Sequence, residues 1–354
     1  MSSCLKFKFD VSTSCIILGI LFVLQKTVLF SESVVLSNLL DILQWPFLLH
    51  ISINMVDVKI KRKEIIRYII ACAIFIMFFF SYMNSGLANI FKYAILMVGL
   101  RRNKNYELFR KFRNVYTIIV VSIFTLGLLR IIPSAIVRRG YFTFGFIHSN
   151  VLAMLILSIV CCDIICNYNK SFRNRAIIYL FIAIVCIVLT NSRSVLIGFI
   201  SVVFFYAFFK RIKNKNISNI MKFLLTALPV TFTILSFYLA YNYDAGNPVF
   251  LLLNKISSER IFLANELTRW FSLTLFGQEC SIALMENSYL TVFFAWGIIP
   301  GLISIAIYSY GICKTISKKE YGVAISLLSF SIQGLFEGSA FELFINLALL
   351  AIFM

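Results

Sequence analysis

The sequence predicts an all-α protein, a polytopic transmembrane helical bundle of about twelve spans with one long external loop. Three observations carry this prediction. Hydrophobic residues make up 60% of the 354 residues and charged residues only 14%, a balance that soluble domains of this length do not show. The apolar residues come in runs of about 15 to 22, the length that crosses a hydrocarbon layer of about 30 Å. Short segments rich in Lys and Arg separate these runs.

Helices are expected because a backbone in lipid must satisfy its own hydrogen bonds. These Ile- and Phe-rich runs are also too long for the strands of a membrane barrel. We expect one integral membrane domain over residues 1–354, in which Lys26 interrupts the first span and Lys92 the fourth. The spans are expected near residues 15–30, 35–55, 65–82, 87–100, 114–132, 146–167, 176–190, 194–209, 221–241, 288–312, 321–336 and 340–354.

The net charge of +18 is explained by topology rather than by nucleic acid. With a cytoplasmic N-terminus, the connections "DVKIKRKEIIR", "RRNKNYELFRKFR", "NKSFRNR", "KRIKNKN" and "KTISKK" all fall on the cytoplasmic side, as the positive-inside rule expects. Both termini are then cytoplasmic. The cations left for the outer side are Lys26, Arg130, Arg138, Arg139, Arg193, Lys255, Arg260 and Arg269.

The one long segment outside the spans, residues 242–286, is placed outside the membrane by this topology. Within it, "NKISSERIFLANELTRWFSLTLFG" predicts an amphipathic helix, with Ser257 or Ser258 as its cap and Gly277 as its stop. Helical phasing puts Arg260 on the apolar face and Arg269 about 180° away. We expect Arg269 to be solvated. An arginine within the apolar stripe, however, needs an anionic partner.

The sequence lacks a phosphate loop, a dinucleotide fingerprint, a paired-histidine zinc motif and an Asp-x-Asp motif. The outer face offers other polar groups. His148, in "GFIHSN", begins a span, where it is either a structural interfacial residue or a functional group. Glu286, in "MENSYL", precedes the tenth span, where it is either a solvated carboxylate or a general base.

Arg193 lies in "IVLTNSRSVLIG", where only Asn191 to Arg193 separate two apolar runs. So short a turn forces the flanking helices into adjacent antiparallel packing. One interpretation is an arginine that extends to the lipid headgroups. The other is a phosphate ligand, because guanidinium makes two charge-assisted hydrogen bonds and stays ionised in a poor dielectric.

Four segments together resemble the O-antigen polymerase and ligase superfamily of bacterial envelope polysaccharide enzymes. "LTNSRSVLIG" resembles its Thr-x-Ser-Arg turn, and "GFIHSNVLA" its Gly-Phe-x-His-x-Asn span start. "SSERIFLANELTRWFSLTLFGQ" resembles the external loop with its leading arginine and closing Phe-Gly, and "ENSYLTVFFAWG" resembles the start of the next span. The resemblance covers about residues 140 to 300.

The resemblance implies glycosyl transfer at the outer face of the bacterial cytoplasmic membrane, with a sugar chain on undecaprenyl pyrophosphate as donor. The arginines that bind the lipid pyrophosphate map onto Arg193 and Arg260. The ligase branch has a histidine, ten residues and then a glycine at the last motif. Here Glu286 and Gly297 have that spacing, and the replacement of histidine by glutamate favours the polymerase branch.

The expected function is therefore a polymerase that joins lipid-linked oligosaccharide repeat units into capsular or O-antigen polysaccharide. Glu286 is the expected base, and Arg193 and Arg260 the expected ligands of the leaving pyrophosphate. The remaining candidates, for contacts to the sugars or their orientation, are His148, Asn150, Asn287, Tyr289 and Arg269. No metal or other cofactor is expected, because the lipid pyrophosphate is already an activated leaving group.

The expected partners are the lipid-linked donor and acceptor, membrane lipids, a flippase and a chain-length regulator, with no nucleic acid. Two alternatives stay open. One is a ligase that passes the glycan to another acceptor. The other is a transporter of lipid-linked oligosaccharides, which is expected to carry charge along a central cavity between two matching halves. No internal repeat is visible in the sequence.

Overall fold

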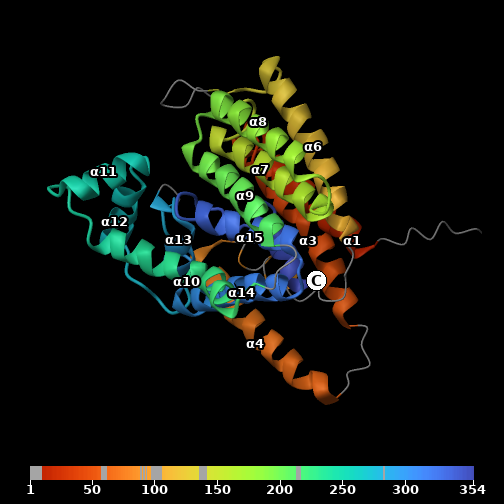
Figure 1. Ribbon diagram of the computed structural model, residues 1–354. Coiled ribbons are helices and arrows are strands. Elements are labelled where there is room, and N and C mark those ends of the chain that lie inside the picture. Colours follow the sequence, from red (N-terminus) through yellow and green to blue (C-terminus); the bar gives the residue numbers. More distant parts are fainter. Residues whose placement is uncertain are drawn as a thin grey trace, which may run out of the picture.

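The computed structural model describes residues 10–56, 62–87, 90, 92, 94–96, 106–134, 142–212, 217–281 and 284–354 (Figure 1). Within these ranges the regular structure is helical, apart from isolated bridge residues that include the antiparallel pair Thr27 and Phe146. The prediction of an all-α bundle is confirmed for them. The helices are α1 (Val11–Gln25), α2 (Val28–Ser31), α3 (Val34–Val56), α4 (Arg62–Ser85), α6 (Glu107–Leu128), α7 (Ser149–Asn167), α8 (Phe172–Thr190), α9 (Arg193–Ile212), α10 (Asn219–Tyr241), α11 (Pro248–Ile256), α12 (Arg260–Trp270), α13 (Ser288–Phe294), α14 (Ile298–Ser317), α15 (Tyr321–Gln333) and α16 (Ala348–Phe353).

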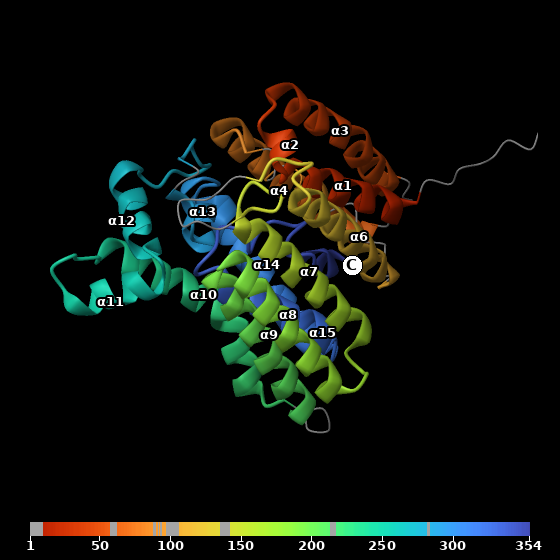
Figure 2. The same cartoon turned by 90° about the horizontal axis from the view of Figure 1, so that it is seen from above.

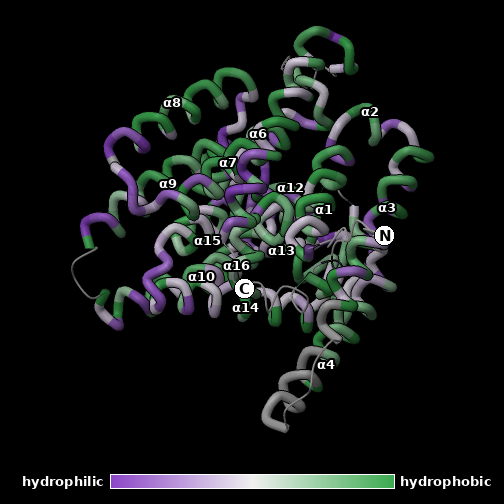
Figure 3. The backbone as a smooth tube through the Cα atoms, turned by 90° about the vertical axis from the view of Figure 1, so that its right-hand side faces the viewer, coloured by the Kyte–Doolittle hydropathy of each residue, from purple (hydrophilic) through white to green (hydrophobic). Residues whose placement is uncertain are grey.

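In the described ranges, seven helices are long and apolar enough to cross a membrane: α3, α6, α7, α8, α9, α10 and α14. Shorter apolar helices lie at Val11–Gln25, Cys72–Ser85 and Tyr321–Gln333. Several outer helices present apolar side chains to their surroundings, as Ile177, Phe181 and Val188 of α8 do, and α8 is hydrophobic along most of its length (Figure 3). The chain is thus a multi-pass membrane protein. The count of twelve spans stays a prediction, since the fourth, 87–100, lies largely outside the described residues.

The centre of the bundle is α15, which packs against α7, α9 and α14. Twelve of its thirteen residues are buried, and a helix that is apolar on all sides is stable only inside a protein or lipid. The helix α8 packs against α7 and α9 and runs antiparallel to both (Figure 2). Asn191 makes the turn between α8 and α9 in the left-handed conformation, with φ 49°.

The prediction of a membrane-spanning helix over residues 340–354 is wrong. Residues 334–347 form irregular backbone in the middle of the bundle, and only the short α16 follows. The Tyr116 hydroxyl donates to the carbonyl oxygen of Phe344 at 2.9 Å, and the Asn346 amide donates to the carbonyl oxygen of Ala340 at 2.8 Å. Irregular backbone at membrane depth is tolerated only when the protein satisfies its polar groups in this way. Apolar composition alone does not reveal such a segment.

The predicted span 288–312 is also not one helix, because α13 ends at Phe294 and α14 begins at Ile298. Gly297 between them has φ +102°, a conformation that side chains rarely allow. The backbone of the preceding loop closes the gap: the N–H groups of Ile298 and Ile299 donate to the carbonyl oxygens of Thr274 and Leu275 at 2.9 and 3.1 Å. The loop is thereby tied to the start of α14.

The predicted helix of the loop is present as α12, and a further helix, α11, precedes it. Ser258 and Glu259 lie between them with φ 58° and 70°, and the N-cap residue of α12 is Glu259 rather than Ser257 or Ser258. The helix α12 ends at Trp270 rather than at Gly277. Its Asn265 amide donates to the carbonyl oxygen of Ala240 at 2.7 Å, which fixes α12 against the end of α10.

Candidate functional site

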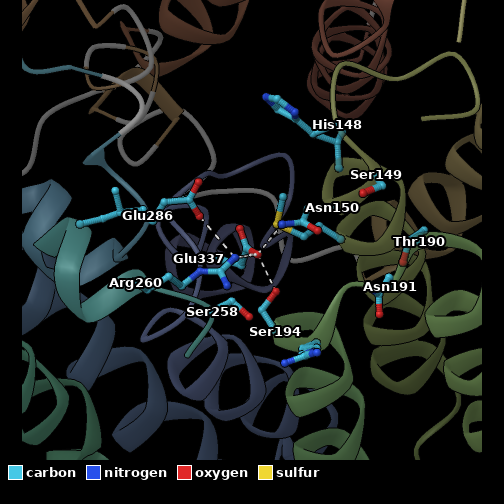
Figure 4. A pocket seen from close by; sticks show the side chains of 14 residues that line it. His148, Ser149, Asn150, Thr190, Asn191, Ser194, Ser258, Arg260, Glu286 and Glu337 are labelled. Carbon is cyan, nitrogen blue, oxygen red and sulfur yellow. Dashed lines mark hydrogen bonds and ion pairs between the residues drawn. The ribbon is translucent and has the colours of Figure 1, made fainter. Parts of the chain in front are cut away.

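A cavity of about 380 Å³ lies where four parts of the chain meet (Figure 4). These are the start of α7, the turn between α8 and α9, the start of α12, and the irregular backbone on which Glu286 and Glu337 lie beside each other. Five sequence candidates line this cavity, namely His148, Asn150, Arg193, Arg260 and Glu286. Residues that are far apart in the sequence are thus brought together. The cavity is also lined by Ser149, Val151, Met154, Thr190, Asn191, Ser194, Ser258, Leu263 and Glu337.

The turn between α8 and α9 places Arg193 at the first helical position of α9. The hydroxyl of Thr190 accepts a hydrogen bond from the N–H of Ser192 at 3.3 Å, and Asn191 supplies the left-handed residue that so short a turn requires. The Arg193 side chain is exposed. Among the described residues, none forms a hydrogen bond or ion pair with its guanidinium. Arg193 is therefore a charged donor group free to bind a ligand.

Arg260, at the start of α12, has a largely buried side chain with 11% of its surface exposed. Its Nη2 lies 2.6 Å from Oε1 of Glu337 and 3.3 Å from Oε2 of Glu286. Its Nη1 donates to the carbonyl oxygen of Ser257 at 3.3 Å. The sequence-based expectation that Arg260 needs an anionic partner is met by two carboxylates, and a buried guanidinium requires such compensation.

Glu337 is the residue of the site that the sequence reasoning missed. One of its carboxylate oxygens, Oε1, accepts hydrogen bonds from the Asn150 amide at 2.9 Å, from Arg260 and from the Ser194 hydroxyl, as the dashed lines in Figure 4 mark. Only 7% of its side chain is exposed. A signal was present in the sequence, because "FEGSAF" places a carboxylate directly after the predicted span 321–336.

Burial raises the pKa of Glu337 to about 7. The Arg260 charge and hydrogen bond and the Ser194 hydroxyl oppose this shift, while the Glu286 charge adds to it. Because desolvation is the largest cause, the carboxyl at the centre of the site changes its charge near neutral pH. The pairing of Arg260 therefore depends on pH.

The two carboxylates are neighbours because the backbones that carry them are joined. The Ser288 N–H donates to the carbonyl oxygen of Gly334 at 2.9 Å, and the Ser288 hydroxyl accepts from the N–H of Ala340 at 2.9 Å. A Cβ atom at Gly338 would collide with the carbonyl oxygen of Met285. Glycine at 338 thus permits the close approach that sets Glu286 beside Glu337 and Arg260.

His148 is exposed, and its side chain makes no capping hydrogen bond to α7 although it occupies the N-cap position. Figure 4 shows it at the edge of the cavity, apart from the cluster around Glu337. A structural capping role for the imidazole is therefore not seen. Its place at the edge suits contact with a large ligand that enters the cavity.

Three further sequence candidates do not line the cavity. The Asn287 side chain caps α13, accepting from the N–H groups of Tyr289 and Leu290 at 3.0 and 3.1 Å. The buried hydroxyl of Tyr289 donates to the carbonyl oxygen of Ser331 at 2.6 Å. Arg269 is exposed and lies 3.4 Å from Glu266, in agreement with the expectation that it is solvated. Sugar contacts by these three side chains stay a prediction.

Within the described ranges, no group of three or more His, Cys, Asp or Glu side chains is arranged to hold a metal ion. The cavity instead combines two guanidinium groups, two carboxylates, an imidazole and several hydroxyl and amide groups. Such a set can bind an anionic group beside a carboxylate that accepts a proton. No protein-family model, curated protein or solved structure matches the chain.

Proposed function

We propose that this protein is a polymerase that joins undecaprenyl-pyrophosphate-linked oligosaccharide repeat units into capsular or O-antigen polysaccharide. One observation carries the proposal: Arg193, which has no partner among the described residues, shares a cavity with Arg260 and the partly exposed Glu286. Guanidinium groups are the preferred ligands of phosphate. The four motifs that resemble the polymerase and ligase superfamily supply the cavity's arginines, histidine and Glu286.

The proposal places the cavity at the outer face of the bacterial cytoplasmic membrane, with both termini in the cytoplasm. The cavity lies at the start of α7, the end of α8 and the start of α9. The opposite ends of these helices carry Lys170, Arg173, Arg175, Lys210 and Arg211. The distribution of cations thus favours an outward-facing cavity by the positive-inside rule. Twelve spans and an external loop belong to the same proposal.

The two arginines bind the pyrophosphate of the donor and stabilise the charge that grows on it as the glycosidic bond to phosphate breaks. Preorganised donors at a leaving group commonly contribute several kcal/mol, about 3 to 4 for a single donor. Arg193 offers a whole unpaired guanidinium, whereas Arg260 is held in place by Glu337. An unpaired and a fixed donor together suit a leaving group that departs from the site after each turnover.

Glu286 is the proposed general base. In the resting site its carboxylate lies 3.3 Å from Arg260 with 38% of its side chain exposed. When Arg260 binds the pyrophosphate, the partly exposed Glu286 carboxylate is available to the acceptor hydroxyl in the same cavity. It takes the proton of the acceptor hydroxyl, and that oxygen attacks the anomeric carbon of the donor. The bond from this carbon to the phosphate oxygen breaks, undecaprenyl pyrophosphate leaves with the electron pair, and the configuration inverts.

Glu337 is a positioning residue in this mechanism rather than the base. Its Oε1 already accepts three hydrogen bonds, and its side chain is far less exposed than that of Glu286. Its charge fixes the guanidinium of Arg260 at the wall of the cavity. The function of Glu337 is therefore to orient the donor group that contacts the leaving pyrophosphate.

The proposal is tested in a strain that depends on this protein for its polysaccharide. Arg193→Ala and Arg260→Ala are expected to abolish the ladder of polymer lengths and to leave single repeat units. Arg269→Ala is the matched comparison, because Arg269 is an exposed arginine of α12 outside the cavity, and it is expected to have a much smaller effect on the ladder. An intact ladder in Arg193→Ala would contradict the proposed polymerase function.

A further inference from the structure

A second cavity of about 540 Å³ lies at the other end of α7, between α6 and α8. Its polar wall carries Arg113 of α6, Asp163 of α7, Arg175 of α8 and Lys170 of the connecting turn. Nothing in the proposed glycosyl transfer uses these residues, because they lie at the opposite helix ends from Glu286 and Arg193. The cavity requires an explanation of its own.

Asp163 organises this cavity. Its carboxylate accepts hydrogen bonds from Arg113 Nη1 at 2.8 Å, from the Tyr179 hydroxyl at 2.7 Å and from Arg175 Nη1. The Asn167 amide donates to it as well, at 2.8 Å. One negative charge therefore holds two guanidinium groups in fixed positions. With Lys170 beside them, the cavity has an excess of positive charge.

Donor groups remain available in this cluster. The contacts of Arg175 to Asp163 and Tyr179 both use Nη1. Among the described residues, none accepts a hydrogen bond from its Nε or Nη2. Lys170 is exposed. The Ser171 side chain, at the N-cap of α8, makes no capping hydrogen bond, so the positive end of that helix also faces this region. An anion that entered the cavity would meet oriented, unused donors.

The remaining wall is apolar. Ile159 of α7 and Ile178 and Ile182 of α8 line the same cavity, and Ile178 is exposed on the outer surface of the bundle. Arg113 and Arg175 lie within two turns of the ends of their helices, a depth of about 5 to 9 Å at 1.5 Å per residue. Membrane-spanning helices end in the headgroup regions, which extend about 5 to 7 Å beyond the hydrocarbon core on each side, so side chains near such helix ends are within reach of lipid phosphates.

From this combination of fixed cations and an apolar wall at headgroup depth, we propose that the cavity is a binding site for an anionic phospholipid. The phosphate contacts Arg175 and Lys170, and an acyl chain lies along Ile159, Ile178 and Ile182. The guanidinium of Arg113 already donates to Asp163 and Asn114 and adds its charge to the site. A free phosphate ion would use only the polar half of the cavity. The proposal rests on the membrane location of the chain and not on the proposed polymerase activity.

The test uses the purified full-length protein in nanodiscs that contain phosphatidylglycerol and phosphatidylcholine in equal amounts. The lipid that stays bound after transfer to detergent is identified by mass spectrometry. We expect phosphatidylglycerol to be retained in preference to phosphatidylcholine. Removal of one cation by Lys170→Gln or Arg175→Gln is expected to lower this preference about fivefold, since each Lys or Arg near a lipid headgroup contributes about that factor.

Lys318→Gln is the matched control, because Lys318 is a cation at the end of α14 that does not line the cavity. Lys170→Gln keeps the proposal testable if Arg175→Gln fails to fold, since Lys170 makes no contact to Asp163. Equal retention of both lipids would overturn the proposal, as would a phosphatidylglycerol preference that Lys170→Gln leaves unchanged. Thermal stabilisation by inorganic phosphate as large as that by phosphatidylglycerol would also overturn it, because the ligand would then need no acyl chain.

Discussion

The pairing of Glu337 with Arg260 leads to a quantitative prediction about the replacement of Glu337. The change Glu337→Ala removes the partner that lies 2.6 Å from a guanidinium with 11% exposure. Breaking a buried ion pair costs about 3 to 5 kcal/mol, because the remaining charge is left uncompensated. Glu286, 3.3 Å from the same nitrogen, still offsets part of that cost. We therefore expect a loss at the lower end, about 3 kcal/mol.

The change Glu337→Gln separates charge from shape. The amide keeps an oxygen that can accept from Arg260 and Ser194 but loses the negative charge. Charge-assisted hydrogen bonds are about twice as strong as neutral ones, so the hold of this side chain on Arg260 weakens by about 1 kcal/mol. The free energy of unfolding is not expected to fall, because burial raises the pKa of Glu337 and the folded protein therefore favours a neutral group at this position. Where the weaker hold on Arg260 misplaces its guanidinium against the leaving group, polymer formation is expected to fall about fivefold in Glu337→Gln and more than a hundredfold in Glu337→Ala.

The assay measures both thermal unfolding in detergent and polymer formation from lipid-linked repeat units. Glu342→Gln is the matched control, because Glu342 belongs to the same irregular segment and forms an ion pair with Lys26 at 3.4 Å, with both side chains about one quarter exposed. Such a pair contributes about 0 to 1 kcal/mol. Wild-type stability and polymer formation in Glu337→Ala would refute the role assigned to Glu337.

Three further predictions concern pH and the backbone. Burial raises the pKa of Glu337 to about 7 from 4.5, so the folded state binds this proton more tightly than the unfolded state does. The free energy of unfolding is therefore expected to fall by about 3 kcal/mol as the pH rises from 4.5 to 7. Melting of the wild type at different pH values checks this, with Glu337→Gln, in which the fall is absent, as the comparison. Asn191 has φ 49°, a conformation that glycine adopts readily and alanine does not. Asn191→Gly is therefore expected to leave the melting temperature nearly unchanged, and Asn191→Ala to lower the free energy of unfolding by about 1 kcal/mol. Equal melting temperatures of the two variants would contradict this prediction. Gly297 has φ +102°, and its Cα lies against the backbone of Gly277. Gly297→Ala is therefore expected to lower the free energy of unfolding by about 1 to 3 kcal/mol, measured by thermal unfolding. Gly246→Ala, in an exposed turn, is the control.

The apolar runs predicted most helices correctly because the membrane demands helical backbone wherever lipid surrounds the chain. The same reasoning failed for residues 340–354, since a buried irregular segment is equally apolar. There the backbone polar groups find partners such as Tyr116 and Asn346, which lie in other parts of the chain. Composition cannot supply tertiary partners of this kind.

The candidate site was predictable where a residue departs from its surroundings, as Arg193 does in its short turn and Arg260 on an apolar face. The structure brings both to one cavity with Glu286. Glu337 was not predicted as a site residue, because what marks it is a set of three hydrogen bonds from α7, α9 and α12, which only the folded chain brings together. Asn287 and Tyr289 were conspicuous in sequence, but their side chains satisfy backbone groups near α13 and α15 instead.

The most direct test of the proposed function is reconstitution of the purified protein in liposomes with a lipid-linked oligosaccharide repeat unit. The product is analysed by chain length. We predict stepwise growth of the glycan with release of undecaprenyl pyrophosphate, and no growth with Arg193→Ala protein of unchanged melting temperature. Movement of the lipid-linked substrate across the bilayer without bond formation, or its transfer only to a second kind of acceptor, would contradict a polymerase.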